Sequence, residues 1–289
     1  MVGGHVIRVK DLHESHPVAL PLNYTEYPPP IDLAPWVACF WQIAGEITDG
    51  GSGLHRVLPD GCADVLFDLE CNRRSGGSPA DLVGPMSGAQ VFELRGNVDL
   101  LGVRLRPGAI CAFSGIPGNL LLDSIVPISE LAPQLRINVA ELADVADSPA
   151  RISLLINAYR TRLAALKQPD PIVRHALSRW ARAERPGFSP ISVLTRDLGL
   201  SERAFERRFV AQVGLAPVRY RRLARFRSVL RLHAGGLRDW ATLATMTGFS
   251  DQSHFVRDCR AFAGLTPNEW AASQAASAGF LQDGVVTTF

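Results

Sequence analysis

The sequence lacks the features of membrane proteins and of secreted, disulfide-stabilised proteins. None of its apolar runs reaches the roughly 18 residues that a membrane-spanning helix needs. Its first residues, MVGGHVIRVKDLHESHP, do not follow the charged and then apolar pattern of a secretory signal. The cysteines are few, odd in number and without a CxxC pair. They are Cys39, Cys62, Cys71, Cys111 and Cys259. These absences favour a reducing cytoplasm.

The motifs of common enzyme chemistries are absent as well. The sequence shows no Ser-His-Asp arrangement, phosphate-binding loop or set of four zinc ligands. We therefore expect no catalytic residue, no metal and no cofactor. One alternative stays open, namely an enzyme built from the front half, or from Cys62 as an acceptor of alkyl groups. A lowered pKa of the Cys62 thiol would support that alternative.

The charge of the chain is small overall but unevenly distributed. The net charge of the 289 residues is +2, yet residues 171–270 hold 17 arginines and 8 acidic residues, a net charge of +9. The rest of the chain carries −7. A basic part joined to an acidic part suggests that one binds a polyanion and the other has a different task. The length allows two domains with cores of their own.

The basic part contains a repeat with a period of about fifty residues. One copy reads GLSERAFERRFVAQVGLAP, residues 199–217, and the other GFSDQSHFVRDCRAFAGLTP, residues 248–267. With one extra residue in the second copy, the matching pairs are Phe205 and Phe255, Arg207 and Arg257, Gly214 and Gly264, and Pro217 and Pro267. A repeat of this kind indicates one supersecondary unit that is used twice.

Each copy has the pattern of a helix-turn-helix. A short helix ends at a glycine, and Ser201 or Ser250 then offers an N-cap for the next helix. In that next helix an apolar stripe predicts a buried face, and the opposite face is polar. The expected buried stripes are Phe205, Phe209 and Val213 in the first copy and Phe255, Cys259 and Phe262 in the second. A helix across residues 217–233 is expected to join the two copies.

The second copy, with its run SDQSHF, resembles the second half of the DNA-binding domain of the AraC family of bacterial transcription regulators. The resemblance covers residues 171–272, and Cys259 stands where family members usually carry an aromatic residue. It implies two helix-turn-helix motifs and sequence-specific binding of DNA. Outward-facing geometry and the resemblance together give the expected DNA-reading residues, for which a solvated helix face is the alternative. These are Arg203, Glu206, Arg207, Gln252, Ser253, His254 and Arg257.

The front half shows short runs with the period of β-strands. In one of them Ala63, Val65, Phe67 and Leu69 face the same way, although Leu66 breaks the pattern. QVFELR and VDLLGVRLR predict two further strands. Short strands between turns favour a β-sandwich or β-barrel. With the helical rear half, the expected fold class is α+β with several domains.

Parts of the front half, among them RVLPDGCADVLFDL and LLGVRLRPGA, resemble an uncharacterised N-terminal domain found in some AraC-family members. This resemblance implies a cupin-like β-barrel. Trp36, Trp41, Asp60 and Cys62 are candidate ligand-binding residues there, and ordinary core positions are the alternative. The spacing of the nearby His55, Asp60, Cys62 and Asp64 matches no strong metal signature.

A helix expected at residues 148–167 carries an apolar stripe that includes Ile152, Leu155, Tyr159 and Leu166. The stripe is explained either by a seam between two copies of the chain or by packing on the front domain of the same chain. Lys167 to Pro171 is the expected boundary of the DNA-binding part. We divide the chain into a sensing domain at 1–130, a helical linker or dimerisation region at 131–170, the double helix-turn-helix domain at 171–272 and a tail at 273–289.

The sequence thus predicts a cytoplasmic, nucleoid-associated transcription regulator that binds operator DNA and responds to a signal bound by its front domain. The expected partners are double-stranded operator DNA, RNA polymerase if the protein is an activator, an unidentified small-molecule effector and a second copy of the chain, with no membrane. An architectural DNA binder without an effector is the alternative.

Overall fold

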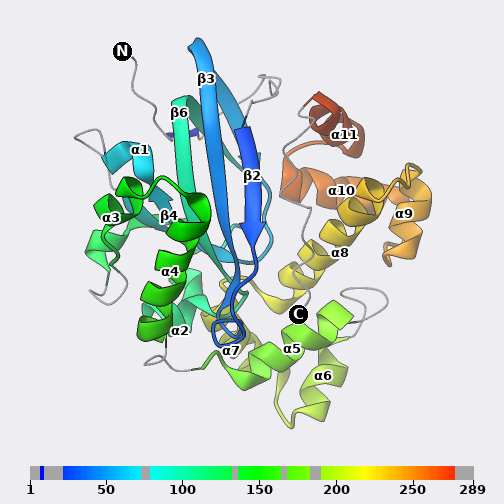
Figure 1. The fold of residues 1–289 in the computed structure, drawn as a ribbon. Coiled ribbons are helices and arrows are strands. Elements are labelled where there is room, and N and C mark those ends of the chain that lie inside the picture. Colours follow the sequence, from blue (N-terminus) through cyan, green and yellow to red (C-terminus); the bar gives the residue numbers. More distant parts are fainter. Residues whose placement is uncertain are drawn as a thin grey trace.

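The computed structural model describes residues 7–9, 22–72, 79–131, 136–163, 168–182 and 190–276. An antiparallel sheet forms the N-terminal part, and helices form the C-terminal part, so the expected α+β class is confirmed. Figure 1 shows α3 and α4 on one side of the sheet and α8 to α11 on the other. The strands are β1 (Ile7–Val9), β2 (Leu22–Tyr27), β3 (Val37–Val57), β4 (Ala63–Asp68), β5 (Ala80–Val83), β6 (Gln90–Leu105) and β7 (Ile125–Pro127).

The sheet follows the strand order β2-β3-β6-β4-β5-β7, and β1 pairs with β6. The two runs QVFELR and VDLLGVRLR, expected as separate strands, form the single strand β6, which is a correction. The strand continues because it pairs with β3 along its whole length, from Val57 opposite Gln90 to Val37 opposite Leu105. Gly96, with a φ of 63°, lies where the register shifts and allows the chain to bend there. No pair of described strands closes the sheet, and the cupin-like barrel stays a prediction.

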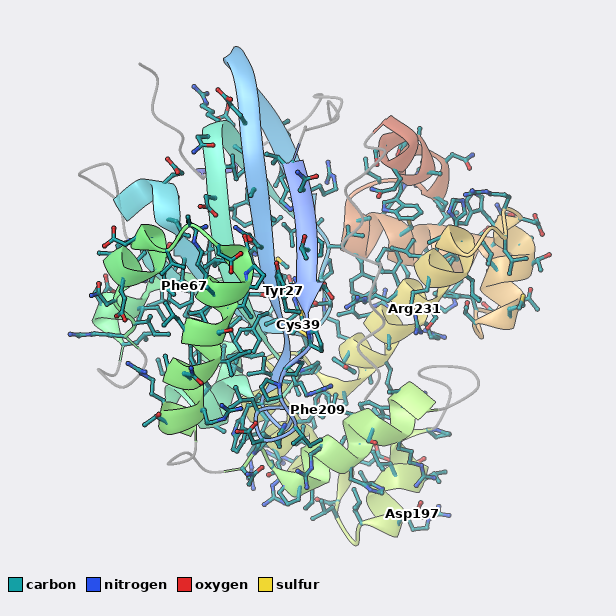
Figure 2. The ribbon with its side chains drawn as sticks, viewed as in Figure 1. Tyr27, Cys39, Phe67, Asp197, Phe209 and Arg231 are labelled. Carbon is teal, nitrogen blue, oxygen red and sulfur yellow. The ribbon has the colours of Figure 1, made fainter. Side chains whose placement is uncertain are left out.

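Apolar side chains cover both faces of the sheet. One face packs with α2 (Ile110–Ser114), α3 (Val139–Asp144) and α4 (Ser148–Leu163), and this core holds the expected stripe Ala63, Val65, Phe67 and Leu69. The other face holds a smaller cluster around Trp41, and Leu66, which breaks the stripe, packs against that cluster. Figure 2 shows Phe67 on the side of α4 and Cys39 on the side of α8.

The apolar stripe of α4 lies against the sheet of its own chain. Ile152, Leu155 and Tyr159 are buried in the core of the front domain, and the ring of Tyr159 lies 5.7 Å from that of Phe113. These three side chains therefore cannot form a seam between two copies of the chain. Of the two explanations given for the stripe, packing on the front domain of the same chain is the correct one. Leu166 lies outside the described residues. Homodimerisation itself stays a prediction.

A second core belongs to the helical part and contains Trp180, Phe209 and Phe226. Its helices are α5 (Pro171–Arg182), α6 (Ile191–Asp197), α7 (Glu202–Val213), α8 (Pro217–Ala234), α9 (Trp240–Met246), α10 (Gln252–Ala263) and α11 (Pro267–Ala276). The predicted joining helix is therefore α8. Within the described residues, no helix is both long and apolar enough to cross a membrane. The part of the tail after residue 276 lies outside the described residues.

Candidate nucleic-acid interface

The first helix-turn-helix consists of α6 and α7, joined at Gly199. Gly199 has a φ of 65°, which a glycine adopts without strain. The side chain of Ser201 accepts a hydrogen bond from the backbone N–H of Ala204 at 3.2 Å and so caps α7 as expected. The predicted inner stripe of Phe205, Phe209 and Val213 is fully buried. This packing fixes which face of α7 is turned to solvent.

The second helix-turn-helix consists of α9 and α10, joined at Gly248, whose φ is 86°. Its predicted inner stripe, Phe255, Cys259 and Phe262, is buried. The expected cap is wrong, because Asp251 and not Ser250 is the N-cap of α10. The carboxylate of Asp251 accepts from the backbone N–H of His254 at 2.7 Å. A carboxylate at this position also complements the positive end of the helix dipole.

The DNA-reading candidates lie on the solvent-facing sides of α7 and α10. Six of the seven are exposed, namely Arg203, Glu206, Arg207, Gln252, Ser253 and Arg257. His254 is half-buried, with its ring 5.2 Å from the ring of Phe249 and its Nδ1 3.2 Å from the hydroxyl of Ser250. The structure thus presents two polar helix faces of the kind that reads base edges in a major groove.

The arginines of α8 have partners within the protein. Arg222 donates to the buried carboxylate of Asp258 on α10 at 2.6 Å. Arg225 donates to the carbonyl oxygen of Gly248 at 3.2 Å, and its guanidinium lies 4.8 Å from the centre of the Phe249 ring. These contacts tie α8 to the second helix-turn-helix. They give these arginines a structural task.

The front-domain candidates Trp41 and Asp60 meet in a buried network centred on Arg104. The indole N–H of Trp41 donates to Asp64 at 2.7 Å, and Arg104 donates to the same carboxylate at 3.3 Å. Asp60 lies 3.6 Å from Arg104 and also 3.6 Å from Arg227 of α8. Burial acts to raise the pKa of Asp60, but these two arginines hold that pKa below its ordinary value.

Of the other two front-domain candidates, Trp36 lies apart from this network and Cys62 adjoins it, since the backbone N–H of Cys62 donates to Asp60 at 2.8 Å. Trp36 is buried in the core between the sheet and α4. The Cys62 thiol is buried beside Asp60, and burial raises its pKa well above the ordinary value. A thiol with a raised pKa is a poor nucleophile, so the structure does not support Cys62 as an alkyl acceptor. Within the described residues, no group of three His, Cys, Asp or Glu side chains is placed to hold a metal ion.

Several residues that contribute to this region were not predicted from the sequence. Arg104 and Arg227 hold the buried network, and Arg56 contacts the end of α10. Arg104 carried a signal, because it is a charged residue inside the apolar run VDLLGVRLR. A charge in such a run is stable only with buried partners. Arg56 and Arg227 carried no such signal.

Two families match the chain. A helix-turn-helix domain matches residues 194–273, and a domain of unknown function, DUF6597, matches residues 25–127. The matched helix-turn-helix family is one of transcription regulators and not of enzymes. A search of the curated proteins finds no match.

Among solved structures, ToxT from Vibrio cholerae O395 is 13% identical, with a TM-score of 0.41 over 87% of this chain and 96% of ToxT. ToxT from Vibrio cholerae strain SCE256 bound to an unsaturated fatty acid is 12% identical, with a TM-score of 0.37 over 90% of this chain and 96% of ToxT.

Proposed function

We propose a mode of DNA binding and control for this chain, which is an AraC-type helix-turn-helix DNA-binding transcription regulator with an N-terminal DUF6597 domain. In this proposal α7 and α10 of one chain enter two adjacent major-groove segments of an operator. The sheet domain receives a signal, such as a small molecule, that changes the affinity for that operator. The protein acts in the cytoplasm, where its operator DNA lies.

One observation carries the DNA-binding part of the proposal. Two helices at equivalent places of a repeat each bury one apolar stripe and turn a polar face to solvent. The linking helix α8 has 18 residues and so spans about 27 Å at about 1.5 Å per residue. With the width of the flanking helices, this length suits two recognition helices about 34 Å apart, which is one turn of DNA.

The role of the sheet domain as a receiver of signals is supported by its contacts with the DNA-binding part. Asp60 of the sheet domain faces Arg227 of α8, and Arg56 of β3 bonds to the end of α10. A change in the sheet domain therefore has a direct physical route to the DNA-binding part. We propose the division of the chain at 1–130, 131–170, 171–272 and 273–289, in which the second part packs through α4 on the sheet of the first.

Selection from a pool of randomised duplexes by the full chain tests the proposed function. We expect enrichment of one sequence with two conserved segments about 10 base pairs apart. An architectural DNA binder would enrich no sequence. Native mass spectrometry of the purified chain then tests for a bound small molecule. Addition of the selected duplex shows whether DNA binding releases that molecule. A chain that carries no added mass and whose DNA affinity is unchanged by cell extract would contradict the signal-receiving role.

Glu206→Ala is expected to separate affinity from specificity. The exposed carboxylate of Glu206 can accept a hydrogen bond from cytosine N4, but it also repels phosphates. The variant should bind scrambled DNA more tightly and lose preference at one base position of the selected duplex. Fluorescence anisotropy on both duplexes at one fixed salt concentration measures this, because the phosphate contribution varies steeply with salt. An equal loss of affinity on both duplexes would show that Glu206 holds the helix and does not read DNA.

A further inference from the structure

The sheet domain touches both recognition helices at the same point of the repeat. Gly214 ends α7 and Gly264 ends α10, each with a left-handed backbone, and the two glycines are matching positions. One element of the sheet domain lies against each of these ends. The two contacts come from parts of the sheet domain that are far apart in sequence, namely Gly118 and Arg56.

The end of α7 is in backbone-to-backbone contact with the sheet domain. Gly118, in the short turn of helix Gly118–Leu120, lies so close that an added Cβ would come within 2.9 Å of the backbone nitrogen of Gly214. The same Cβ would lie 3.0 Å from the carbonyl oxygen of Gln212. In the other direction, a Cβ on Gly214 would lie 2.8 Å from the carbonyl oxygen of Gly118. Only glycine on both sides permits this approach.

The end of α10 is held by a charged hydrogen bond. Nη1 of Arg56, on β3, donates to the carbonyl oxygen of Ala263, the last residue of α10, at 3.1 Å. The last carbonyl groups of a helix have no partner within the helix, and they carry the negative end of its dipole. A guanidinium is therefore well suited to this place.

The sheet domain also holds α8 between these two ends. Arg219 donates to the carbonyl oxygen of Ser87 at 2.7 Å, and Arg227 lies 3.6 Å from Asp60. The ring of Tyr220 lies against Gly61, where an added Cβ would come within 2.6 Å of it. The helix that links the two helix-turn-helix units is thus held along its length on the side of the sheet domain.

We propose that the sheet domain fixes the distance and angle between α7 and α10, with Arg56 and Gly118 as positioning residues. This inference rests on the proposed binding of two adjacent groove segments by one chain. Without the sheet domain, α8 and its neighbours alone would set the separation of the two helices. With it, both helices are held at their C-terminal ends by one further body, and the spacing of the two operator segments becomes a fixed requirement.

The spacing of the operator tests this inference. One inserted base pair moves the second segment by about 3.4 Å along the axis and rotates it by about 35°. The probes are the duplex selected by the full wild-type chain and the same duplex with one base pair added or removed midway. We expect the wild-type chain to lose affinity about thirtyfold on either change, which corresponds to one lost set of base contacts.

The Arg56→Ala variant should bind the original duplex less tightly than the wild-type chain does. Its affinity should fall only about threefold further on either change of spacing, because α10 is then free to adjust. Gly118→Ala, which pushes the sheet domain away from the end of α7, should relax the spacing requirement in the same way. The matched control is Arg95→Ala. Arg95 belongs to the same pair of long strands, but it is half-buried and bonds to Glu93 at 2.6 Å, away from the helical part.

The outcomes separate this inference from the proposed function. A wild-type chain that selects no duplex contradicts the function itself. If the wild-type chain selects a duplex but tolerates changed spacing, the function stands and the positioning role is overturned. It is also overturned if both variants are folded, as judged by circular dichroism, and lose as much affinity as the wild-type chain does when the spacing is changed.

Discussion

Replacing Arg207 and Arg257 together by alanine is expected to weaken binding to the selected duplex by about a hundredfold or more. The two arginines are matching positions of the repeat, and both are exposed on the polar faces of α7 and α10. A bidentate contact between arginine and guanine is worth about 1–3 kcal/mol of discrimination, so each single change should weaken binding by about tenfold or more. Because the two sites lie on different helices and share no partner, the two losses should add.

Arg208→Ala is the matched control for this experiment. Arg208 also lies on α7, but its guanidinium pairs with Asp170 at 3.0 Å, beside the first residue of α5. It should therefore change the affinity for DNA by less than about threefold, because the charge of Arg208 is already paired within the protein. Anisotropy on the selected and scrambled duplexes at one salt concentration measures all variants. Binding of the double variant within threefold of wild type would exclude these arginines as base readers.

Replacing Arg104 by methionine is expected to lower the free energy of unfolding by about 3–5 kcal/mol, the usual cost of removing one partner from a buried ion pair. Arg104 is buried, and its guanidinium lies near three carboxylates, at 3.3 Å from Asp64, 3.5 Å from Glu26 and 3.6 Å from Asp60. The variant leaves these carboxylates without their central cation. Arg95→Ala, at a half-buried pair of one arginine and one glutamate, should change the free energy of unfolding by much less than Arg104→Met does.

The loss caused by Arg104→Met should depend on pH. The pKa of Asp60 is lowered in the fold, so Asp60 contributes stability above its unfolded pKa of about 3.9, and this contribution is lost as pH falls through its folded pKa. Burial raises the pKa of Asp64, with Arg104 opposing, so this group is protonated first once Arg104 is gone.

The difference in the free energy of unfolding between wild type and variant should therefore be full at pH 7 and narrow toward pH 4, because Asp64 of the variant is then protonated and no longer needs a cation. The contribution of Asp60 is lost only at lower pH. Urea unfolding at both pH values measures it. Adding Asp64→Asn to the variant should recover part of the loss at pH 7. A difference that stays constant with pH would show that Arg104 acts by packing and not by charge.

The helix-turn-helix units could be predicted because their information is local. A stripe such as Phe205, Phe209 and Val213 repeats with the period of a helix, and the flanking glycines mark the turns. The one local error, the cap of α10, arose because Ser250 and Asp251 are adjacent and both are good caps. Only the backbone geometry decides between them.

The front domain and its contacts were harder to predict for a physical reason. The alternation of β4 identified its buried face, but it did not show that the opposite face of the sheet is covered by an apolar cluster as well. The contact between Arg56 and Ala263 joins residues that are 207 positions apart. No local pattern marks such a pair, because it depends on how two separately formed cores meet.

Footprinting of the selected duplex with the wild-type chain, Arg207→Ala and Arg257→Ala tests the central claim most directly. If α7 and α10 each read one groove segment, the wild-type chain protects two segments on one face of the DNA, about one turn apart. Each variant then loses protection at a different one of the two segments. Loss of the same segment by both variants, or protection of a single segment by the wild-type chain, would contradict the claim that one chain reads DNA with two recognition helices.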